Sequence, residues 1–245
     1  MEKIMLIAGC SHAAGSEIDG TEDSVYNRQH SFGGLLAVKM GHRPINIAMP
    51  GAANLTVARS ILQWFDEEYD PKTMEVFVLI SWTESSRMEL PDFKGGAYRN
   101  SNIAIDWFPE ESQRYSRVTF GSSADLPEEQ LEIKQVQRFM ADHLEYLEIN
   151  SALMALHLQS FLENRSVRYC MCDTGIMFSD NVFIKFYLNQ MDHTHYMNMG
   201  EDERSSFYWK YKNAGYTNPK AKYWHHGEEP HALYANDLHR FILNK

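Results

Sequence analysis

Four short apolar runs, separated by segments with helical spacing, set the pattern of this chain. The runs cover residues 4–8, 43–49, 74–81 and 167–172, and the first and third of them contain no polar alternation. An unbroken apolar run of this length is typical of a strand buried on both faces of a parallel sheet. The four runs therefore predict the strands of such a sheet.

Apolar residues at helical spacing predict helices over residues 24–40, 54–65, 128–164 and 233–243. Gly41 follows the first helix as a stop, and Asn54 or Thr56 is expected to cap the second. The third is either one helix or two with a break near Asn150-Ser151. Strand and helix alternate, which predicts an α/β fold: a doubly wound, flavodoxin-like parallel sheet in three α/β/α layers.

Two segments interrupt this alternation. Residues 91–126 show no clear periodicity and predict a long loop or a lid-like insertion. Residues 175–223 form a second insertion, rich in aromatic residues and histidine. A chain of 245 residues accommodates both insertions within one domain, so we expect a single domain over 1–245.

Charge and cysteine content narrow the possible partners and the compartment. The chain has 33 acidic and 23 basic side chains, a net charge of −10, and contains no run of Lys and Arg. Such a surface repels phosphate backbones, so nucleic-acid binding is not expected. Three cysteines cannot form a disulfide framework for this length, which favours a reducing, cytoplasmic compartment.

The segment Ile7-Ala8-Gly9-Cys10 looks like the cleavage site of a bacterial lipoprotein. Met1-Glu2-Lys3 carries no excess positive charge, however, and the apolar stretch before Gly9 is shorter than the ~7–15 residues of a signal peptide. No other stretch approaches the ~20 apolar residues of a membrane span. We therefore expect no membrane association.

Polar and small residues follow each of the first three predicted strands. Ser11 follows the first, Gly51 and Asn54 the second, and Thr83 and Glu84 the third. Parallel sheets bind ligands at the carboxyl ends of their strands. These residues are therefore candidates for one site, although Ser11 has the alternative role of a simple helix N-cap.

The order of these residues resembles that of the SGNH hydrolase superfamily, the GDSL-type esterases. Gly9-Cys10-Ser11 stands where that family has Gly-Asp-Ser, and an acid-x-x-His pair lies near the C-terminus as in its block V. The resemblance covers residues 4–87 and 228–241. It implies the three-layer fold, ester hydrolysis, Ser11 as the nucleophile and His231 as the general base.

A serine nucleophile needs a base within hydrogen-bond reach and a third group to orient that base. Glu228 precedes His231 by three residues, so its carboxylate is expected to hold one imidazole nitrogen and leave the other for the serine proton. The family has Asp at this position. His225 and His226 are the competing bases.

Ester hydrolysis also needs donors to the oxyanion. The backbone N–H groups of Ser11 and Gly51 are the first two candidates. The family's third donor is an Asn in block III, but Thr83 occupies the matching position. The third donor is then the Thr83 hydroxyl or the Asn54 amide.

Trp82, Glu84 and Arg87 follow the third strand and are expected to rim the cleft as substrate-binding candidates. Arg87 either holds a substrate carboxylate or pairs with Glu84 or Glu89. Aromatic residues of the insertions form either a wall that stacks on sugars or a local core. His193 and His195 lack a third metal ligand, so neither a metal nor another cofactor is expected.

Together these features predict a serine hydrolase that cleaves a carboxylic ester, such as an O-acetyl or short acyl ester on a small molecule or glycan. Two alternatives remain open. The same residues would support acyl transfer to an alcohol, and loss of the block III Asn allows a non-catalytic binding protein on the same scaffold. The sequence predicts no oligomeric state.

Overall fold

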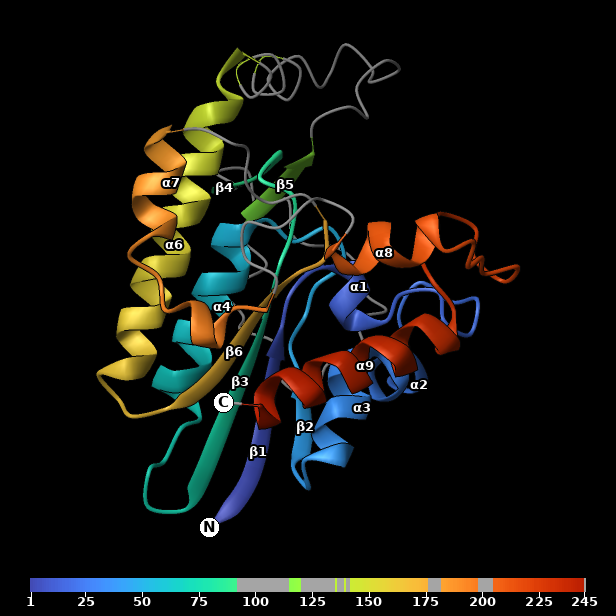
Figure 1. Cartoon of the computed structure of the whole chain (residues 1–245), viewed down its shortest axis with the longest axis horizontal. Coiled ribbons are helices and arrows are strands. Elements are labelled where there is room, and N and C mark those ends of the chain that lie inside the picture. Colours follow the sequence, from blue (N-terminus) through green and yellow to red (C-terminus); the bar gives the residue numbers. More distant parts are fainter. Residues whose placement is uncertain are drawn as a thin grey trace.

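A four-stranded parallel sheet forms the centre of the computed structural model, which describes residues 1–91, 115–119, 135, 139, 142–175, 182–197 and 205–244. Its strands lie in the order β2-β1-β3-β6 (Figure 1). Their bounds are β1 Glu2–Ala8, β2 Arg43–Asn46, β3 Met74–Trp82 and β6 Arg168–Asp173. All four strands predicted from the apolar runs are confirmed.

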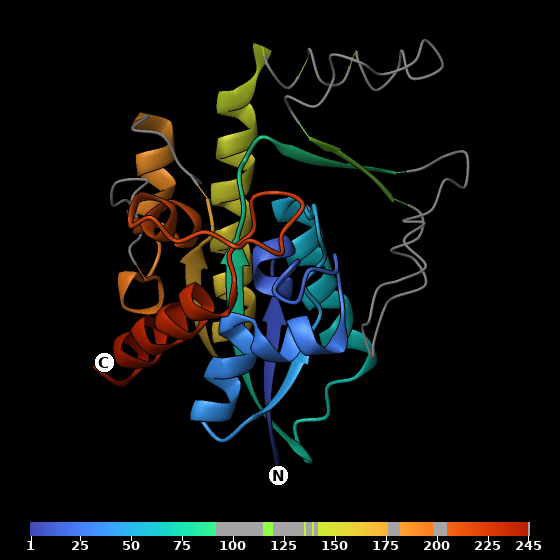
Figure 2. The same cartoon turned by 90° about the vertical axis from the view of Figure 1, so that its right-hand side faces the viewer.

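Helices cover both faces of the sheet (Figures 1 and 2). On one face lie α4 (Asn54–Glu67) and α6 (Leu144–Glu163), and on the other α3 (Phe32–Lys39) and α9 (Glu228–Leu243). Alternate residues of β1 separate accordingly: Leu6 packs with the α4 and α6 side, and Ile7 with the α3 and α9 side. This is the predicted three-layer α/β/α fold.

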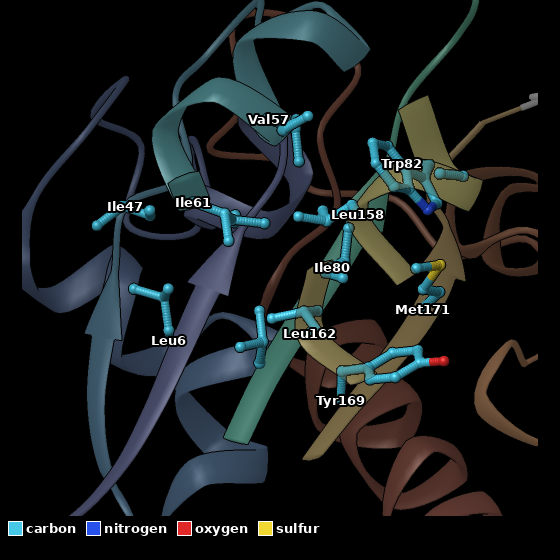
Figure 3. Close-up of a cluster of buried hydrophobic side chains, with 14 of the residues drawn as sticks. Leu6, Ile47, Val57, Ile61, Ile80, Trp82, Leu158, Leu162, Tyr169 and Met171 are labelled. Carbon is cyan, nitrogen blue, oxygen red and sulfur yellow. The ribbon is translucent and has the colours of Figure 1, made fainter. Parts of the chain in front are cut away.

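The core on the α4 and α6 side contains Trp82, which sequence analysis placed at the rim of a cleft. Trp82 is fully buried and packs with Ile80, Met171 and other apolar side chains of this layer (Figure 3). The prediction for Trp82 is wrong, because β3 continues one residue further than expected and keeps this side chain on the core face. Burying a side chain of this kind contributes about 3 kcal/mol or less to stability.

Several helix boundaries differ from the predicted ones. The segment 24–40 is two helices, α2 (Val25–His30) and α3, because Ser31 adopts an extended conformation and its hydroxyl caps α3 by accepting the Gly34 N–H. The N-cap of α4 is Ala53, so neither expected residue is the cap. Of the two alternatives for the break near Asn150-Ser151, the structure has the unbroken one, since α6 continues through these residues.

The insertions are described in part. β4 (Arg87–Pro91) pairs antiparallel with β5 (Tyr115–Thr119), whereas the rest of the predicted lid-like insertion and most of residues 128–141 lie outside the described residues. The second insertion contributes α7 (Val182–Leu188), the 3-10 helix η3 (His193–His195) and α8 (Phe207–Asn213). Figure 1 shows α8 and the short α1 (Ser11–Ala14) at the end of the sheet opposite the N-terminus.

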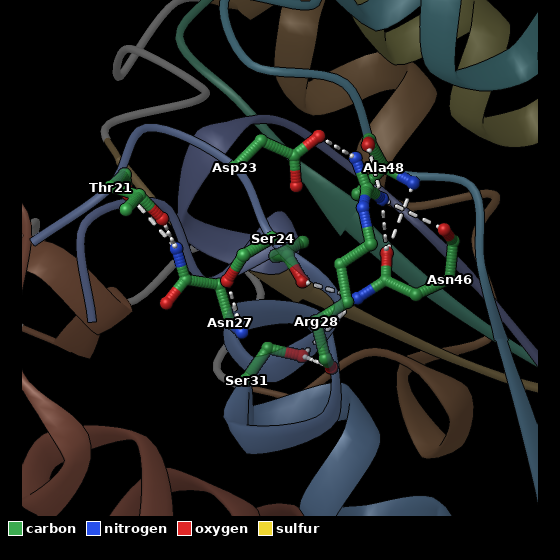
Figure 4. A network of polar contacts seen from close by, with 9 residues as sticks. Thr21, Asp23, Ser24, Asn27, Arg28, Ser31, Asn46 and Ala48 are labelled. Carbon is green, nitrogen blue, oxygen red and sulfur yellow. Dashed lines mark hydrogen bonds and ion pairs between the residues drawn. The ribbon is translucent and has the colours of Figure 1, made fainter. Parts of the chain in front are cut away.

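A buried polar network joins the turn that follows β1 to strand β2 (Figure 4). Arg28 donates to the carbonyl oxygens of Asn46 (2.8 Å) and Ala48 (2.9 Å) and forms an ion pair with Asp23 at 2.7 Å. The Asn46 amide donates to the carbonyl of Ala13 in α1 at 2.9 Å. Because these buried hydrogen bonds join α2, β2 and α1, the network sets the position of α1 against the sheet.

Two further observations bear on the cysteines and on membranes. Cys10, Cys170 and Cys172 are buried free thiols, and Cys10 lies 3.5 Å from the Thr174 hydroxyl, on the β6 side. In the parts of the chain that the structure describes, no helix combines the length and the apolar character that a bilayer crossing requires.

Candidate active site

Parallel pairing brings the turns after β1, β2 and β3 to one edge of the sheet. The Met49 N–H donates to the Gly9 carbonyl at 3.0 Å, so the segment leading to Gly51 runs beside the segment leading to Ser11. Ala8 pairs with Ile80, the last pair of this ladder, and Ser11 and Thr83 each come three residues after it. The structure thus gathers Ser11, Gly51 and Thr83 at the carboxyl edge.

Ser11 opens the four-residue helix α1 after a tight turn. A Cβ on Gly9 would lie 2.6 Å from Ala13 Cβ and 2.9 Å from Ser81 Cβ, so only glycine allows this turn. The N-cap of α1 is Cys10, which excludes the N-cap role for Ser11. Ser11 is 6% exposed, and neither its hydroxyl nor its N–H donates to any residue that the structure describes. Both groups therefore remain available to a substrate.

Of the expected oxyanion donors, Asn54 is already bonded to other residues. Asn54 donates to the Thr83 carbonyl (3.0 Å) and to Ser151 Oγ (3.1 Å), while its oxygen accepts the Thr83 N–H at 2.9 Å. Both amide hydrogens are used, so Asn54 as an oxyanion donor is wrong; it positions Thr83 instead. The Thr83 hydroxyl and the Gly51 N–H have no partner among the described residues, and Gly51 has φ +73°.

The structure separates the expected Glu228–His231 pair. Glu228 accepts a hydrogen bond from Tyr26 Oη at 2.6 Å, and the Phe32 N–H donates to His231 Nδ1 at 3.1 Å. With Nδ1 as an acceptor, neutral His231 carries its proton on Nε2, which then cannot take one from serine. The predicted hydrogen bond is therefore absent, because Nδ1 of His231 serves the first residue of α3.

The environment of His231 is that of a core residue. It is 1% exposed, stacks on Phe32 and contacts Phe207. Burial, with smaller effects from His226 and His225, lowers the pKa of His231 to about 3. His231 is thus a neutral packing residue that binds the amino end of α3.

A different carboxylate–imidazole pair lies at the same edge. Glu17 Oε2 lies 2.6 Å from His225 Nδ1, and both side chains are largely buried. Glu17 Oε1 also accepts the backbone N–H groups of Lys222 (2.9 Å) and Tyr223 (3.2 Å). A carboxylate only accepts, so His225 Nδ1 donates, and in the neutral ring Nε2 has the free lone pair. His225 has the tautomer that a general base needs.

The backbone of Glu17 is held in an unusual conformation. Its φ is +65°, in the left-handed region that non-glycine residues rarely occupy. The Glu17 N–H donates to the Thr21 carbonyl at 2.8 Å, and the Glu17 carbonyl accepts from Asn218 Nδ2 at 2.8 Å. Strain of this kind persists where the surroundings impose it, and it is common at functional sites.

Two more histidines surround His225. The ring of His12, the residue after Ser11, lies 5.1 Å from the ring of His225, which places His225 beside the nucleophile turn. Burial, followed by the charge of His225, holds the pKa of His12 well below its usual value. His226 Nε2 bonds the Tyr208 carbonyl at 3.0 Å, and burial lowers the pKa of this ring. Of these histidines, only His225 contacts a carboxylate within the described chain.

The remaining candidates lie around this edge. The Arg87 side chain is 7% exposed and approaches Glu84 at 3.9 Å, longer than a hydrogen bond. Phe207 and Tyr211 of the second insertion pack as core against α9. His195 bonds Asp192 at 2.8 Å, and no group of three possible metal ligands occurs in the part of the chain that is described.

Comparison with known proteins yields structural likeness alone. No protein-family model and no curated protein matches this sequence. Among solved structures, a carbohydrate esterase family 2 enzyme with a carbohydrate-binding domain from Corynascus thermopiles (Myceliophthora fergusii) matches with a TM-score of 0.50 and 11% identity, over 99% of this chain and 66% of that one.

Two further structures match less closely. An acetyl xylan esterase, Est2A, from the rumen bacterium Butyrivibrio proteoclasticus gives a TM-score of 0.47 at 9% identity, over 99% of this chain and 64% of that one. A carbohydrate esterase with divergent catalytic and non-catalytic binding functions gives 0.43 at 13%, over 100% and 65%. This chain thus spans slightly less than two thirds of each protein's length.

The first of these matches establishes the fold. The chain has the three-layer fold expected of an SGNH hydrolase, and at 11% identity the match concerns the fold alone. The fold agrees with the resemblance drawn from the turns after β1, β2 and β3.

Proposed function

We propose that this protein is a serine esterase that hydrolyses a carboxylic ester through an acyl-serine intermediate, with Ser11 as the nucleophile and His225 as the base. The observation that carries the proposal is the 2.6 Å contact between Glu17 and His225, next to the turn that holds Ser11. It supplies the oriented base that the Glu228–His231 pair does not.

The chemistry follows from these positions. His225 Nε2 takes the proton of the Ser11 hydroxyl as Oγ attacks the ester carbonyl, and Glu17 stabilises the resulting imidazolium. The imidazolium then gives this proton to the departing alcohol, which leaves an acyl group on Ser11. In the second half, His225 takes a proton from water as the water oxygen attacks the acyl carbon. The imidazolium then returns this proton to Ser11 Oγ as the carbon–Oγ bond breaks, which releases the acid and regenerates Ser11 and neutral His225.

Three donors are assigned to the oxyanion of each tetrahedral intermediate. They are the N–H groups of Ser11 and Gly51 and the hydroxyl of Thr83, which all lie at the carboxyl edge without other acceptors among the described residues. Preorganised donors of this kind supply the largest single share of catalysis in many acyl-transfer enzymes. Asn54 holds the Thr83 backbone from both sides and so orients this residue.

We also infer the class of substrate from the structural likeness. The structure that matches with a TM-score of 0.50 is named as a carbohydrate esterase, which favours an O-acetyl or other short acyl ester carried on a carbohydrate. The buried position of Ser11 also favours a small acyl group, because a buried hydroxyl leaves little room for a long one.

The test uses p-nitrophenyl acetate together with a fluorophosphonate probe. The wild-type protein should hydrolyse the ester and be labelled at Ser11, and Ser11→Ala should lose both properties while remaining folded, since the Ser11 hydroxyl bonds no described residue. Ser16→Ala, which removes a buried serine of the same segment, is the matched control and should keep both. Turnover by Ser11→Ala would refute the nucleophile, and a wild-type protein that is neither active nor labelled would favour a binding protein.

A further inference from the structure

Arg87 is a buried cation whose hydrogen-bonding capacity is largely unused. Its Nε has no hydrogen-bond partner among the described residues, Nη1 lies 3.5 Å from the Ala52 carbonyl, and Nη2 lies 3.9 Å from Glu84 Oε2. The side chain is 7% exposed. Burying a guanidinium group whose contacts are this long costs folding free energy unless another acceptor forms hydrogen bonds with it.

Arg87 faces a cavity of about 290 Å³ between the amino end of α4, the start of β4 and α6. Its lining combines a few polar groups with aliphatic side chains, namely Asn54, Leu55, Arg87, Met88, Tyr146, Leu147, Asn150, Ser151 and Met154. Tyr146 is exposed, which places it at the mouth. A volume near the lower end of the usual range suits a small ligand.

The cavity adjoins the catalytic edge. Asn54 lines the cavity and also holds both backbone groups of Thr83, and Arg87 reaches Ala52, the residue after Gly51. The cavity is therefore built from residues that contact or adjoin two of the proposed oxyanion donors, Thr83 and Gly51.

We propose that this cavity binds a carboxylate carried by the ester substrate, with Arg87 as its specificity-determining residue; the proposal rests on the esterase function above. Nε is fully enclosed, whereas Nη2 lies 3.9 Å from Glu84 Oε2 and is not within hydrogen-bond distance of a described acceptor. A carboxylate oxygen in the cavity would complete Nη2 with a charge-assisted hydrogen bond.

Two further features favour an anion on a short carbon skeleton. The cavity lies at the amino end of α4, a helix of 14 residues whose first two residues line it, and a helix amino end favours negative charge. The aliphatic side chains of Leu55, Met88 and Met154 suit the carbon atoms between an ester and its carboxylate. Since the chain carries a net charge of −10, recognition of an anion needs such a local cation.

The experiment measures binding without turnover, in the full-length chain carrying Ser11→Ala. Monomethyl succinate and dimethyl succinate differ only in one carboxylate, and calorimetry should show at least about tenfold tighter binding of the monomethyl ester. Adding Arg87→Gln should abolish this preference, and Arg87→Lys should restore part of it, because an ammonium retains the charge but not the fork. Arg43→Gln, which removes an exposed arginine paired with Glu2, is the matched control and should keep the full preference.

The outcomes separate this proposal from the catalytic one. Equal binding of the two esters, or a preference that survives Arg87→Gln, overturns the carboxylate site even if wild-type protein hydrolyses p-nitrophenyl acetate. Inorganic phosphate that binds more tightly than monomethyl succinate, with the same dependence on Arg87, overturns the carboxylate in favour of a phosphoryl group. A preference lost in Arg87→Gln supports the site even if the wild-type protein proves inactive on esters.

Discussion

Glu17 and His225 lie 2.6 Å apart although 208 residues separate them in sequence. The carboxylate comes from the loop after α1, and the imidazole from the segment before α9. In the SGNH family the acid precedes its histidine by three residues, and here that position is Lys222, whose backbone N–H instead donates to Glu17. The acid of the Glu17–His225 pair thus comes from another part of the chain than that spacing predicts.

We expect Glu17→Gln to lower kcat by about 10³–10⁴ with little change in folding. The N–H groups of Lys222 and Tyr223 need an acceptor, so the new amide oxygen stays with them and its NH₂ faces His225 Nδ1. His225 Nδ1 must then accept a hydrogen bond, so the imidazole proton moves to Nε2. A protonated Nε2 cannot take the proton of Ser11, and the general base is lost. Steady-state kinetics on p-nitrophenyl acetate measure this loss.

Glu228→Gln is the control for that experiment. Glu228 is an exposed carboxylate that accepts from Tyr26, so its amide variant should stay within about threefold of wild-type turnover. A large loss in Glu228→Gln with a small one in Glu17→Gln would restore the pair inferred from sequence.

Substitution of each histidine distinguishes the base from its neighbours. His225→Ala should cost about as much activity as Ser11→Ala, and the double variant little more, because residues that act as one unit are not additive. His231→Asn keeps an acceptor for the Phe32 N–H, and His226→Gln keeps a donor for the Tyr208 carbonyl, so both should retain activity within about tenfold. An inactive His231→Asn with normal stability would contradict this assignment.

Thr83→Val tests the third oxyanion donor. Its hydroxyl has no acceptor among the described residues, so removing it should spare the fold and lower kcat by about 10²–10³ while KM changes little. Thr83→Ser retains the hydroxyl and should recover most of the rate. If kcat is unchanged in Thr83→Val, the backbone donors of Ser11 and Gly51 suffice.

The fold was predictable from sequence because its signals are local. Each strand is a short apolar run, and each helix shows its own periodicity and stop signals. The turn at Gly9 and Ser11 was predictable for the same reason. Errors at helix ends, such as the division at Ser31, arise where one side-chain hydrogen bond decides between continuing and restarting a helix.

The acid–base pair was not predictable in this way. Glu228 and His231 have the expected spacing, but α9 begins at Glu228 and places that carboxylate beside Tyr26, while His231 packs against Phe32. Glu17 belongs to no spacing pattern, and its φ of +65° is visible only in the folded chain. Long-range pairing depends on tertiary structure, which a single sequence does not display.

The depressed pKa of His231 predicts a loss of stability in acid. Its pKa of about 3 in the folded protein lies below the ordinary 6.5, so the unfolded chain binds a proton here that the folded protein refuses. The contribution of His231 is complete above pH 6.5 and is lost as the pH falls from there toward 3, with a slope of up to about 1.4 kcal/mol per pH unit. His231→Asn cannot titrate but keeps the acceptor for Phe32, so its free energy of unfolding should fall less steeply in this range.

Urea unfolding at intervals between pH 7 and pH 4 measures that difference. His12 and His226 are also buried with lowered pKa values and remain in both proteins, so the difference between the two curves isolates His231. His157→Asn, which replaces an exposed histidine on α6, should reproduce the wild-type curve. Parallel curves for wild type and His231→Asn would show that His231 is protonated in the folded protein, and would return its imidazole to the list of candidate bases.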